Sequence, residues 1–172
     1  MEERQKLVTV KGNPVTLVGD PIEVGDHAPD FRVVDNEMNS VNFSSFLGKV
    51  LIISSVPSLD TPVCEIETKR FNEEAGRLGK EVQVLTISMD LPFAQKRWCA
   101  AAEANNLLTL SDYRHASFGL AWGVLIKELR LLARAVFVVD RKEIVRYVEL
   151  VKETGMEPDY DAVLAAVKGL IE

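Results

Sequence analysis

The chain has 172 residues, of which 47% are hydrophobic, and a formal net charge of −6 at pH 7. This length and apolar content suffice for a sizeable core, and the negative charge argues against a nucleic-acid or anionic-membrane surface. The sequence has no run of about 18 apolar residues, which a membrane-spanning helix requires. The charged start at residues 1–6 has no apolar signal core, so we expect a cytoplasmic location.

The first part of the chain predicts a β-hairpin. Residues 7–18 alternate apolar and polar side chains on either side of a turn that contains Gly12, Asn13 and Pro14. We therefore expect an N-terminal hairpin over about residues 7–18.

Beyond the hairpin, short strands give way to alternating strands and helices. The expected elements are strands at 31–34 and 41–43, a helical turn at 44–48, a strand at 50–54, a helix at 62–78, a strand at 82–87, a helix at 92–104, a short strand at 107–110, a brief helix at 117–122, strands at 135–139 and 144–148, and a helix at 159–171. This order predicts an α/β fold with a partly parallel sheet covered on both faces. The two late strands form an antiparallel pair, which makes the sheet mixed. No repeat or linker divides the chain, and we expect one domain over residues 1–172.

The numbers of cysteines and histidines limit which kinds of functional site the chain can form. Two cysteines are too few for a disulfide-stapled secreted scaffold. His27 and His115 do not cluster with a cysteine, so we expect no metal site and no other cofactor. Both histidines are expected to be ordinary surface or loop residues.

The strongest chemical signal is a cysteine at the expected start of a helix. Residues 57–64 have the sequence Pro-Ser-Leu-Asp-Thr-Pro-Val-Cys. Thr61 is a good N-cap, and Pro62 is a good first helical residue because the N–H that proline lacks would be unpaired there. Cys64 then lies near free backbone N–H groups and the positive end of the helix dipole, a setting that favours thiolate over thiol. A reactive sulfur is the first hypothesis, and a buried, inert cysteine is the alternative.

Cys99 lies inside the helix expected at 92–104, which also follows a strand. Since ligand sites collect at the C-terminal ends of strands, both sulfurs are expected on one rim of the sheet. Three interpretations are open: a structural disulfide, two unrelated thiols, or an attacking Cys64 whose sulfenic acid is captured by a resolving Cys99. The third requires local unwinding, because a disulfide needs Cα atoms within about 7 Å.

Motifs around both cysteines resemble those of the bacterial thiol peroxidases, the atypical two-cysteine branch of the peroxiredoxins. The matching segments are Pro57-x-x-x-Thr61-x-x-Cys64, residues 88–95 with Cys99, residues 131–140, the hairpin at 12–15 and residues 157–160. The resemblance covers nearly the whole chain. It implies a thioredoxin-like fold, in which a mixed central sheet is flanked by helices.

The resemblance also implies an activity and partners. The chain is expected to be an antioxidant enzyme that reduces hydrogen peroxide and organic hydroperoxides to water and alcohols, with thioredoxin as reductant, and to form a homodimer. By position, Cys64 is the peroxidatic cysteine and Cys99 the resolving one, joined in an intramolecular Cys64–Cys99 disulfide during turnover.

Three further residues match catalytic positions of that family. Thr61 would orient the peroxide through its hydroxyl, and Pro57 would shape the loop that shields the sulfur. Arg134 would hold the thiolate and polarise the peroxide; burying a cation at the start of a central strand is costly without an anionic partner, which favours this role. Arg130 is the rival, because the family often has Gly-Pro-Leu upstream of the arginine, whereas residues 127–131 are Lys-Glu-Leu-Arg-Leu.

Other classes of function remain open on the sequence. A redox sensor would oxidise the same cysteines with little turnover, and a scaffold protein would have unreactive thiols. A general thiol–disulfide exchanger normally carries C-x-x-C, which is absent. Phe93 and Trp98 are candidates for an apolar peroxide entry, with plain core packing as the alternative.

Overall fold

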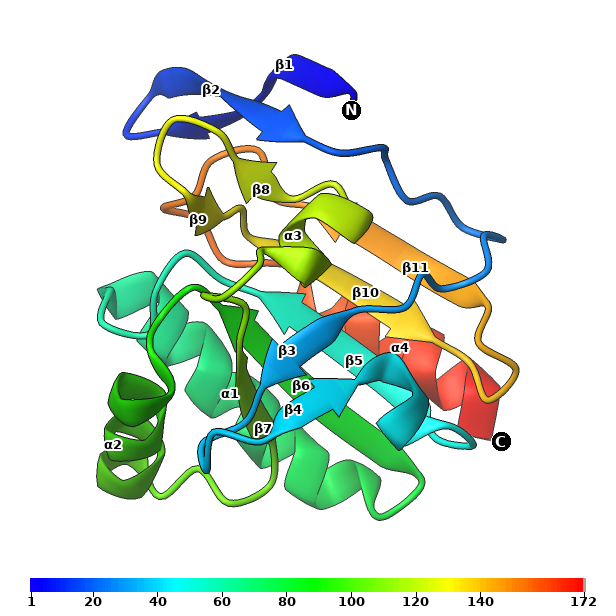
Figure 1. Ribbon diagram of the computed structural model, residues 1–172. Coiled ribbons are helices and arrows are strands. Elements are labelled where there is room, and N and C mark those ends of the chain that lie inside the picture. The colour runs from blue at the N-terminus through cyan, green and yellow to red at the C-terminus, as the bar shows by residue number, and fades with distance from the viewer. Residues whose placement is uncertain (172) are drawn as a thin grey trace.

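A computed structural model describes residues 1–171, which form two β-sheets and their covering helices (Figure 1). The strands are β1 (Glu3–Val10), β2 (Asn13–Val18), β3 (Arg32–Val34), β4 (Ser40–Asn42), β5 (Val50–Ser55), β6 (Val82–Ser88), β7 (Leu108–Ser111), β8 (Leu125–Ile126), β9 (Leu131–Leu132), β10 (Ala135–Val139) and β11 (Val145–Leu150). The helices are the 3-10 turn η1 (Phe43–Phe46), α1 (Pro62–Leu78), α2 (Pro92–Ala102), α3 (Ser117–Ala121) and α4 (Tyr160–Ile171). No helix within this part of the chain has the length and apolar character needed to cross a bilayer.

The central sheet is mixed, as expected. Its seven strands have the order β11-β10-β5-β6-β7-β3-β4. Strands β5, β6 and β7 pair in parallel, whereas β10 pairs antiparallel with both β5 and β11. The parallel strands place the starts of α1 and α2 at one edge of the sheet, because each helix follows the C-terminal end of its strand.

Alternating side chains of the central strands pack into two hydrophobic cores, one on each face of the sheet. Val50 and Ile52 of β5 pack with α1 and α4 on one face. Leu51 and Ile53 face the other side, where they join residues of the N-terminal hairpin, α3 and the four-stranded sheet. Every residue of β5 is buried, which explains the apolar run over its first four residues, Val50 to Ile53.

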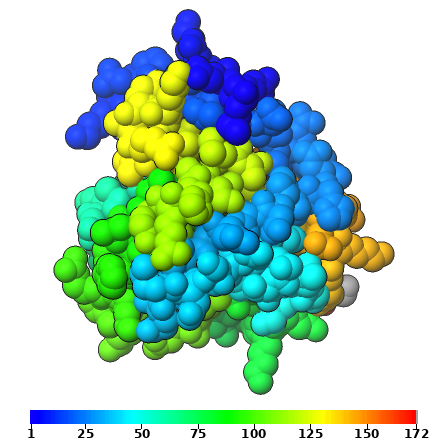
Figure 2. Space-filling view, in the orientation of Figure 1, coloured from blue at the N-terminus to red at the C-terminus, as the bar shows by residue number. Residues whose placement is uncertain are grey.

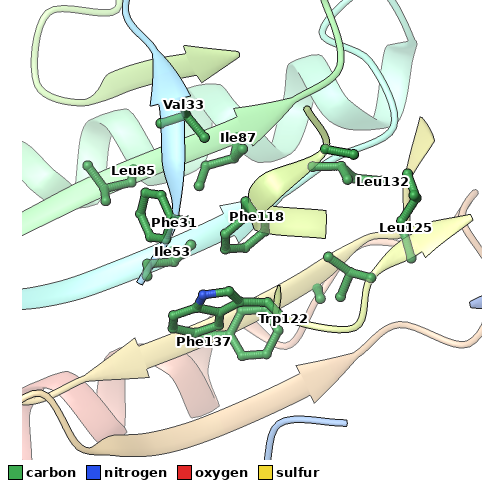
Figure 3. Close-up of a cluster of buried hydrophobic side chains, with 14 of the residues drawn as sticks. Phe31, Val33, Ile53, Leu85, Ile87, Phe118, Trp122, Leu125, Leu132 and Phe137 are labelled. Carbon is green, nitrogen blue, oxygen red and sulfur yellow. The ribbon is translucent and has the colours of Figure 1, made fainter. Parts of the chain in front are cut away.

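Aromatic side chains fill the second core (Figure 3). Trp122 stacks on Phe118 with ring centroids 5.4 Å apart and meets Phe137 edge-on at 5.0 Å. Phe31 lies edge-on to Phe118 at 5.4 Å. Such pairs contribute about 0.5–1.5 kcal/mol each beyond area burial, so this cluster anchors α3 on the sheet.

The smaller sheet has the order β1-β2-β8-β9 and contains the expected N-terminal hairpin. The hairpin begins at Glu3, four residues before the expected start. Strand β2 pairs with β8, so segments distant in the sequence lie side by side, as the blue and yellow regions of Figure 2 show. The short β8–β9 pair was not expected, because strands of two residues are too short to show alternation.

Most of the other boundaries agree with the expected elements. Helix α1 and strand β10 have the expected bounds, 62–78 and 135–139. Helix α2 ends at Ala102 instead of residue 104, because Glu103 adopts a left-handed backbone with φ 55° and closes the helix.

Candidate active site

Cys64 is the third residue of α1, at the rim expected from the sequence. Its side chain is fully buried and packs with Val56 and Leu59, while Trp98 of α2 closes the cluster. Thr61 occupies the N-cap position, with an extended backbone at φ −100° and ψ 147°, but its side chain makes no capping hydrogen bond. The structure thus confirms Thr61 as the N-cap residue, without the side-chain hydrogen bond that usually accompanies this position.

The Thr61 hydroxyl has a different partner. It donates to the carbonyl oxygen of Ser58 at 2.9 Å. This bond tightens the turn before α1 and leaves the lone pairs of the Thr61 oxygen available to accept a hydrogen bond.

Arg134 lies directly against the sulfur. Its Nη2 donates to Cys64 Sγ at 3.2 Å, and its side chain is almost completely buried just before β10. Nε and Nη2 both donate to the carbonyl oxygen of Thr154, at 3.0 and 2.7 Å. Nη1 donates to Glu67 Oε1 at 3.2 Å. The guanidinium is thus held by the Thr154 carbonyl oxygen and the Glu67 carboxylate and directed at Cys64.

Glu67 supplies the anionic partner that a buried arginine requires. It lies one helical turn after Cys64 on the same face of α1 and is fully buried. Ser54 of β5 donates its hydroxyl to Glu67 Oε2 at 2.6 Å. Burial raises the pKa of Glu67 to about 7, although Arg134 and Ser54 oppose the rise. Glu67 was not among the residues proposed from the sequence. Its position three residues after Cys64, on the same face of the expected helix, is the sequence feature that could have indicated it.

A cleft of about 350 Å³ opens over the start of α1. The residues that line it come from the hairpin, the loop before α1, the first turn of α1, β9 and the residues just after it, and the segment after β11: Val10, Lys11, Pro57, Thr61, Pro62, Val63, Leu131, Arg134, Glu153, Thr154 and Gly155. The structure therefore brings Pro57, Thr61 and Arg134 to one cleft beside Cys64. Phe93 and Trp98 do not line this cleft: Phe93 is 68% exposed, and Trp98 packs on the Cys64 cluster.

Cys99 faces a different cavity. Its Sγ lies 3.3 Å from Thr109 Oγ1 of β7, and Thr109 donates to Asn36 Oδ1 at 3.0 Å. Cys99 lines a cavity of about 470 Å³ between α2, β7 and the turn after β3. Both cysteines are free thiols, and the neighbouring Trp98 is the residue of α2 that contacts Cys64.

Known proteins resemble this chain over most of its length. The Redoxin family matches residues 23–164. The chain is 56% identical to a thiol peroxidase of Oceanobacillus iheyensis over 92% of this chain and 96% of that protein. It is 53% identical to the thiol peroxidase of Bacillus subtilis over 96% and 98% of the two chains. The chain belongs to the thiol peroxidases of the redoxin family.

Solved structures confirm the thioredoxin-like fold of this thiol peroxidase. A peroxiredoxin-like protein from Aquifex aeolicus superposes with a TM-score of 0.90 at 46% identity, covering 96% of this chain and 98% of that one. A thiol peroxidase from Chromobacterium violaceum superposes with a TM-score of 0.84 at 22% identity, covering 94% and 95%. The chain is therefore a peroxiredoxin-type oxidoreductase.

The rival cation of this thiol peroxidase lies elsewhere. Arg130 is exposed in the turn between β8 and β9, where it has a left-handed φ of 55° and its N–H donates to the carbonyl oxygen of Ile126. Only Arg134 of the two donates to Cys64.

His27 and His115 are both exposed, as expected.

We expect Glu67 to make the thiol peroxidase less stable as pH rises. Its pKa is about 7 in the folded chain and 4.5 as an ordinary glutamate. The folded state therefore binds the proton more tightly, and the stability present below about pH 4.5 is lost as pH rises through about 7. The difference corresponds to on the order of 3 kcal/mol.

Urea unfolding between about pH 5 and 8 checks this expectation, in a Cys64→Ser background so that the thiol does not titrate. Adding Glu67→Gln, which cannot ionise, should remove most of the decline in the free energy of unfolding. An equal decline with and without Glu67→Gln would show that another group is responsible.

Proposed function

We propose that this thiol peroxidase reduces hydrogen peroxide and organic hydroperoxides through Cys64, with thioredoxin as reductant. The single observation that carries the proposal is the hydrogen bond from Arg134 Nη2 to the buried Cys64 Sγ, at 3.2 Å. A neighbouring guanidinium and a helix N-terminus both stabilise a thiolate, which is the nucleophilic form of cysteine.

In the first step the Cys64 thiolate attacks one oxygen of the hydroperoxide. A sulfur–oxygen bond forms, the oxygen–oxygen bond breaks, and Cys64 is oxidised to a sulfenic acid. The departing oxygen takes a proton from solvent and leaves as water or alcohol. Arg134 is placed to stabilise the charge on that oxygen. The Thr61 oxygen, whose own proton is donated to Ser58, can accept the hydroperoxide's proton in a hydrogen bond.

In the second step the Cys99 sulfur attacks the Cys64 sulfenic acid. The sulfur–sulfur bond forms and water leaves, which gives the Cys64–Cys99 disulfide. Because the Cys99 thiol contacts Thr109 while Cys64 is buried behind Trp98, a helix start must open first. Pro62 and Pro92 begin α1 and α2, and such first turns lack intrahelical bonds from their N–H groups.

In the third step the dithiol of thioredoxin reduces the disulfide and restores both thiols. We further propose that the protein serves antioxidant defence in the cytoplasm, where thiols are kept reduced, and that it acts as a homodimer. The antioxidant role and the homodimer depend on the resemblance of the sequence to its family.

Cys99→Ser tests the assignment of the resolving cysteine. The variant should consume about one peroxide per subunit and then stop, because nothing captures the sulfenic acid. Mass spectrometry should find Cys64 as sulfenic or sulfinic acid, while the wild type cycles with thioredoxin and its reductase. If the oxidised wild type runs as a disulfide-linked dimer on non-reducing gels, intramolecular resolution is wrong. If it oxidises but hardly cycles, the redox-sensor alternative is favoured instead.

A further inference from the structure

Asp90 connects the segments that carry the two cysteines. It lies between β6 and α2, two residues before the Pro92 that begins the helix of Cys99. Its Oδ2 accepts from the backbone N–H of Leu59 at 2.8 Å, and its Oδ1 accepts from the hydroxyl of Ser58 at 2.7 Å. Both donors belong to the loop that leads into α1 and Cys64.

The same segment is fastened to the sheet and to α2. Ser88 donates its hydroxyl to Asp90 Oδ2 at 2.7 Å, and Ser111 of β7 donates to the Asp90 carbonyl oxygen. The fully buried Gln95 of α2 donates from Nε2 to Ser88 Oγ at 3.0 Å and to the carbonyl oxygen of Leu110 at 2.9 Å. The Asp90 carboxylate thus lies on a rigid base, and the loop before Cys64 is the element it holds.

The loop that Asp90 holds forms a wall around the reactive sulfur. Leu59 is 3% exposed and packs directly with Cys64. Hydrogen bonds to a charged carboxylate are roughly twice as strong as neutral ones. Without the carboxylate, the buried N–H of Leu59 loses its acceptor, a loss that favours opening of the loop.

We propose that Asp90 is a positioning residue that sets the balance between two arrangements of the site. In the closed arrangement its carboxylate holds the loop, and Cys64 faces Arg134 and reacts with peroxide. In the open arrangement the bonds to Ser58 and Leu59 are broken, and Cys99 can reach the Cys64 sulfenic acid. This inference rests on the proposed function and adds a residue outside the peroxide cleft to it.

The balance also decides between two fates of the sulfenic acid. Attack by Cys99 forms the disulfide and releases water. Attack of the sulfenate on a second hydroperoxide breaks its oxygen–oxygen bond, oxidises Cys64 to sulfinic acid and releases water or alcohol. If the closed arrangement lasts longer, more of the sulfenate reacts with a second hydroperoxide and more sulfinic acid forms.

Asp90→Ala is the decisive variant, with Asp90→Asn as its matched partner. Rapid-quench mass spectrometry on the full chain would follow sulfenic acid, disulfide and sulfinic acid after addition of cumene hydroperoxide. For Asp90→Ala we expect slower sulfenic acid formation, disulfide formation faster by roughly tenfold, and less sulfinic acid at a given peroxide excess. Hydrogen exchange at residues 57–66 should also be faster in the reduced protein.

Asp90→Asn should shift both rates in the same directions as Asp90→Ala but by less, because it keeps the hydrogen bonds in their weaker neutral form. The asparagine oxygen can accept from Leu59 and Ser88, and its amide can donate to the Ser58 hydroxyl. Asp20→Ala, at an exposed position just after β2, serves as a control for the loss of one negative charge. If Asp90→Ala does not fold, Ser58→Ala removes one bond from the loop side and should shift both rates in the same directions by less.

Several results overturn the inference. Disulfide formation that is unchanged or slower in Asp90→Ala would show that the carboxylate does not hold the site closed. An equal effect of Asp90→Asn would show that the negative charge matters and the hydrogen bonds do not. Failure of the proposed function itself looks different, because the wild type would then form no Cys64 sulfenic acid at all.

Discussion

Replacing Cys64 with serine is expected to abolish peroxide reduction at every concentration of thiol reductant. A serine hydroxyl is a weak nucleophile without an activating base, and neither Arg134 nor Glu67 is placed as a base for it. Peroxide consumption by Cys64→Ser, with thioredoxin and thioredoxin reductase present, should fall to the rate measured without protein. The effect is the largest that we expect, because every later step of the cycle requires the Cys64 sulfenic acid.

Cys99→Ser is the matched control for this substitution. It removes the other thiol by the same atomic change, yet it should retain the first reaction with peroxide. Substantial turnover by Cys64→Ser would overturn the assignment of the attacking sulfur. Loss of the first reaction in Cys99→Ser would also contradict it, since Cys99 contacts Thr109 and not the Cys64 cleft.

Arg134→Gln is expected to lower the second-order rate with peroxide by roughly 10²–10³-fold, the effect of removing one donor from a site of developing negative charge. A thiol at its reference pKa is about 3% thiolate at pH 7, so loss of thiolate alone accounts for at most roughly thirtyfold. The remainder would measure stabilisation of the departing oxygen. Stopped-flow peroxide rates, combined with the pH dependence of Cys64 alkylation, separate the two contributions.

Two controls accompany the arginine variant. Arg130→Gln makes the same change in an exposed turn and should be nearly neutral. Because Arg134→Gln leaves Glu67 buried without its cation, the double variant Glu67→Gln/Arg134→Gln should recover stability without recovering the peroxide rate. A damaging Arg130→Gln together with a mild Arg134→Gln would show that the catalytic arginine has been misassigned.

Several features of the site follow from short-range patterns in the sequence. The bounds of α1 and the place of Cys64 in its first turn depend on Thr61, Pro62 and Gly79, which act within a few residues of themselves. The alternation of apolar strands with helices likewise predicts the mixed sheet. One local rule failed, because the Thr61 hydroxyl bonds to Ser58 instead of capping the helix.

Other features depend on contacts between distant segments. Arg130 and Arg134 are four residues apart in similar sequence. Because β9 pairs with β8 and β10 pairs with β5, Arg130 lies in the β8–β9 turn and the Arg134 guanidinium is buried beside Cys64. The pKa of Glu67 is raised because its side chain is completely buried. The sequence does not show this burial, because a glutamate on a helix is usually exposed.

The sequence by itself therefore determined which sulfur sits at a helix start and on which rim of the sheet. The resemblance already pointed to Pro57, Thr61 and Arg134, and the tertiary structure added Glu67 and Asp90 around that sulfur. It placed Cys99 of α2 against Thr109, and it tied the Cys64 loop to Asp90, 31 residues from Leu59 along the chain. The physical reason is range: capping and periodicity act within one or two helical turns, whereas burial and ion pairing depend on where the whole chain brings its segments together.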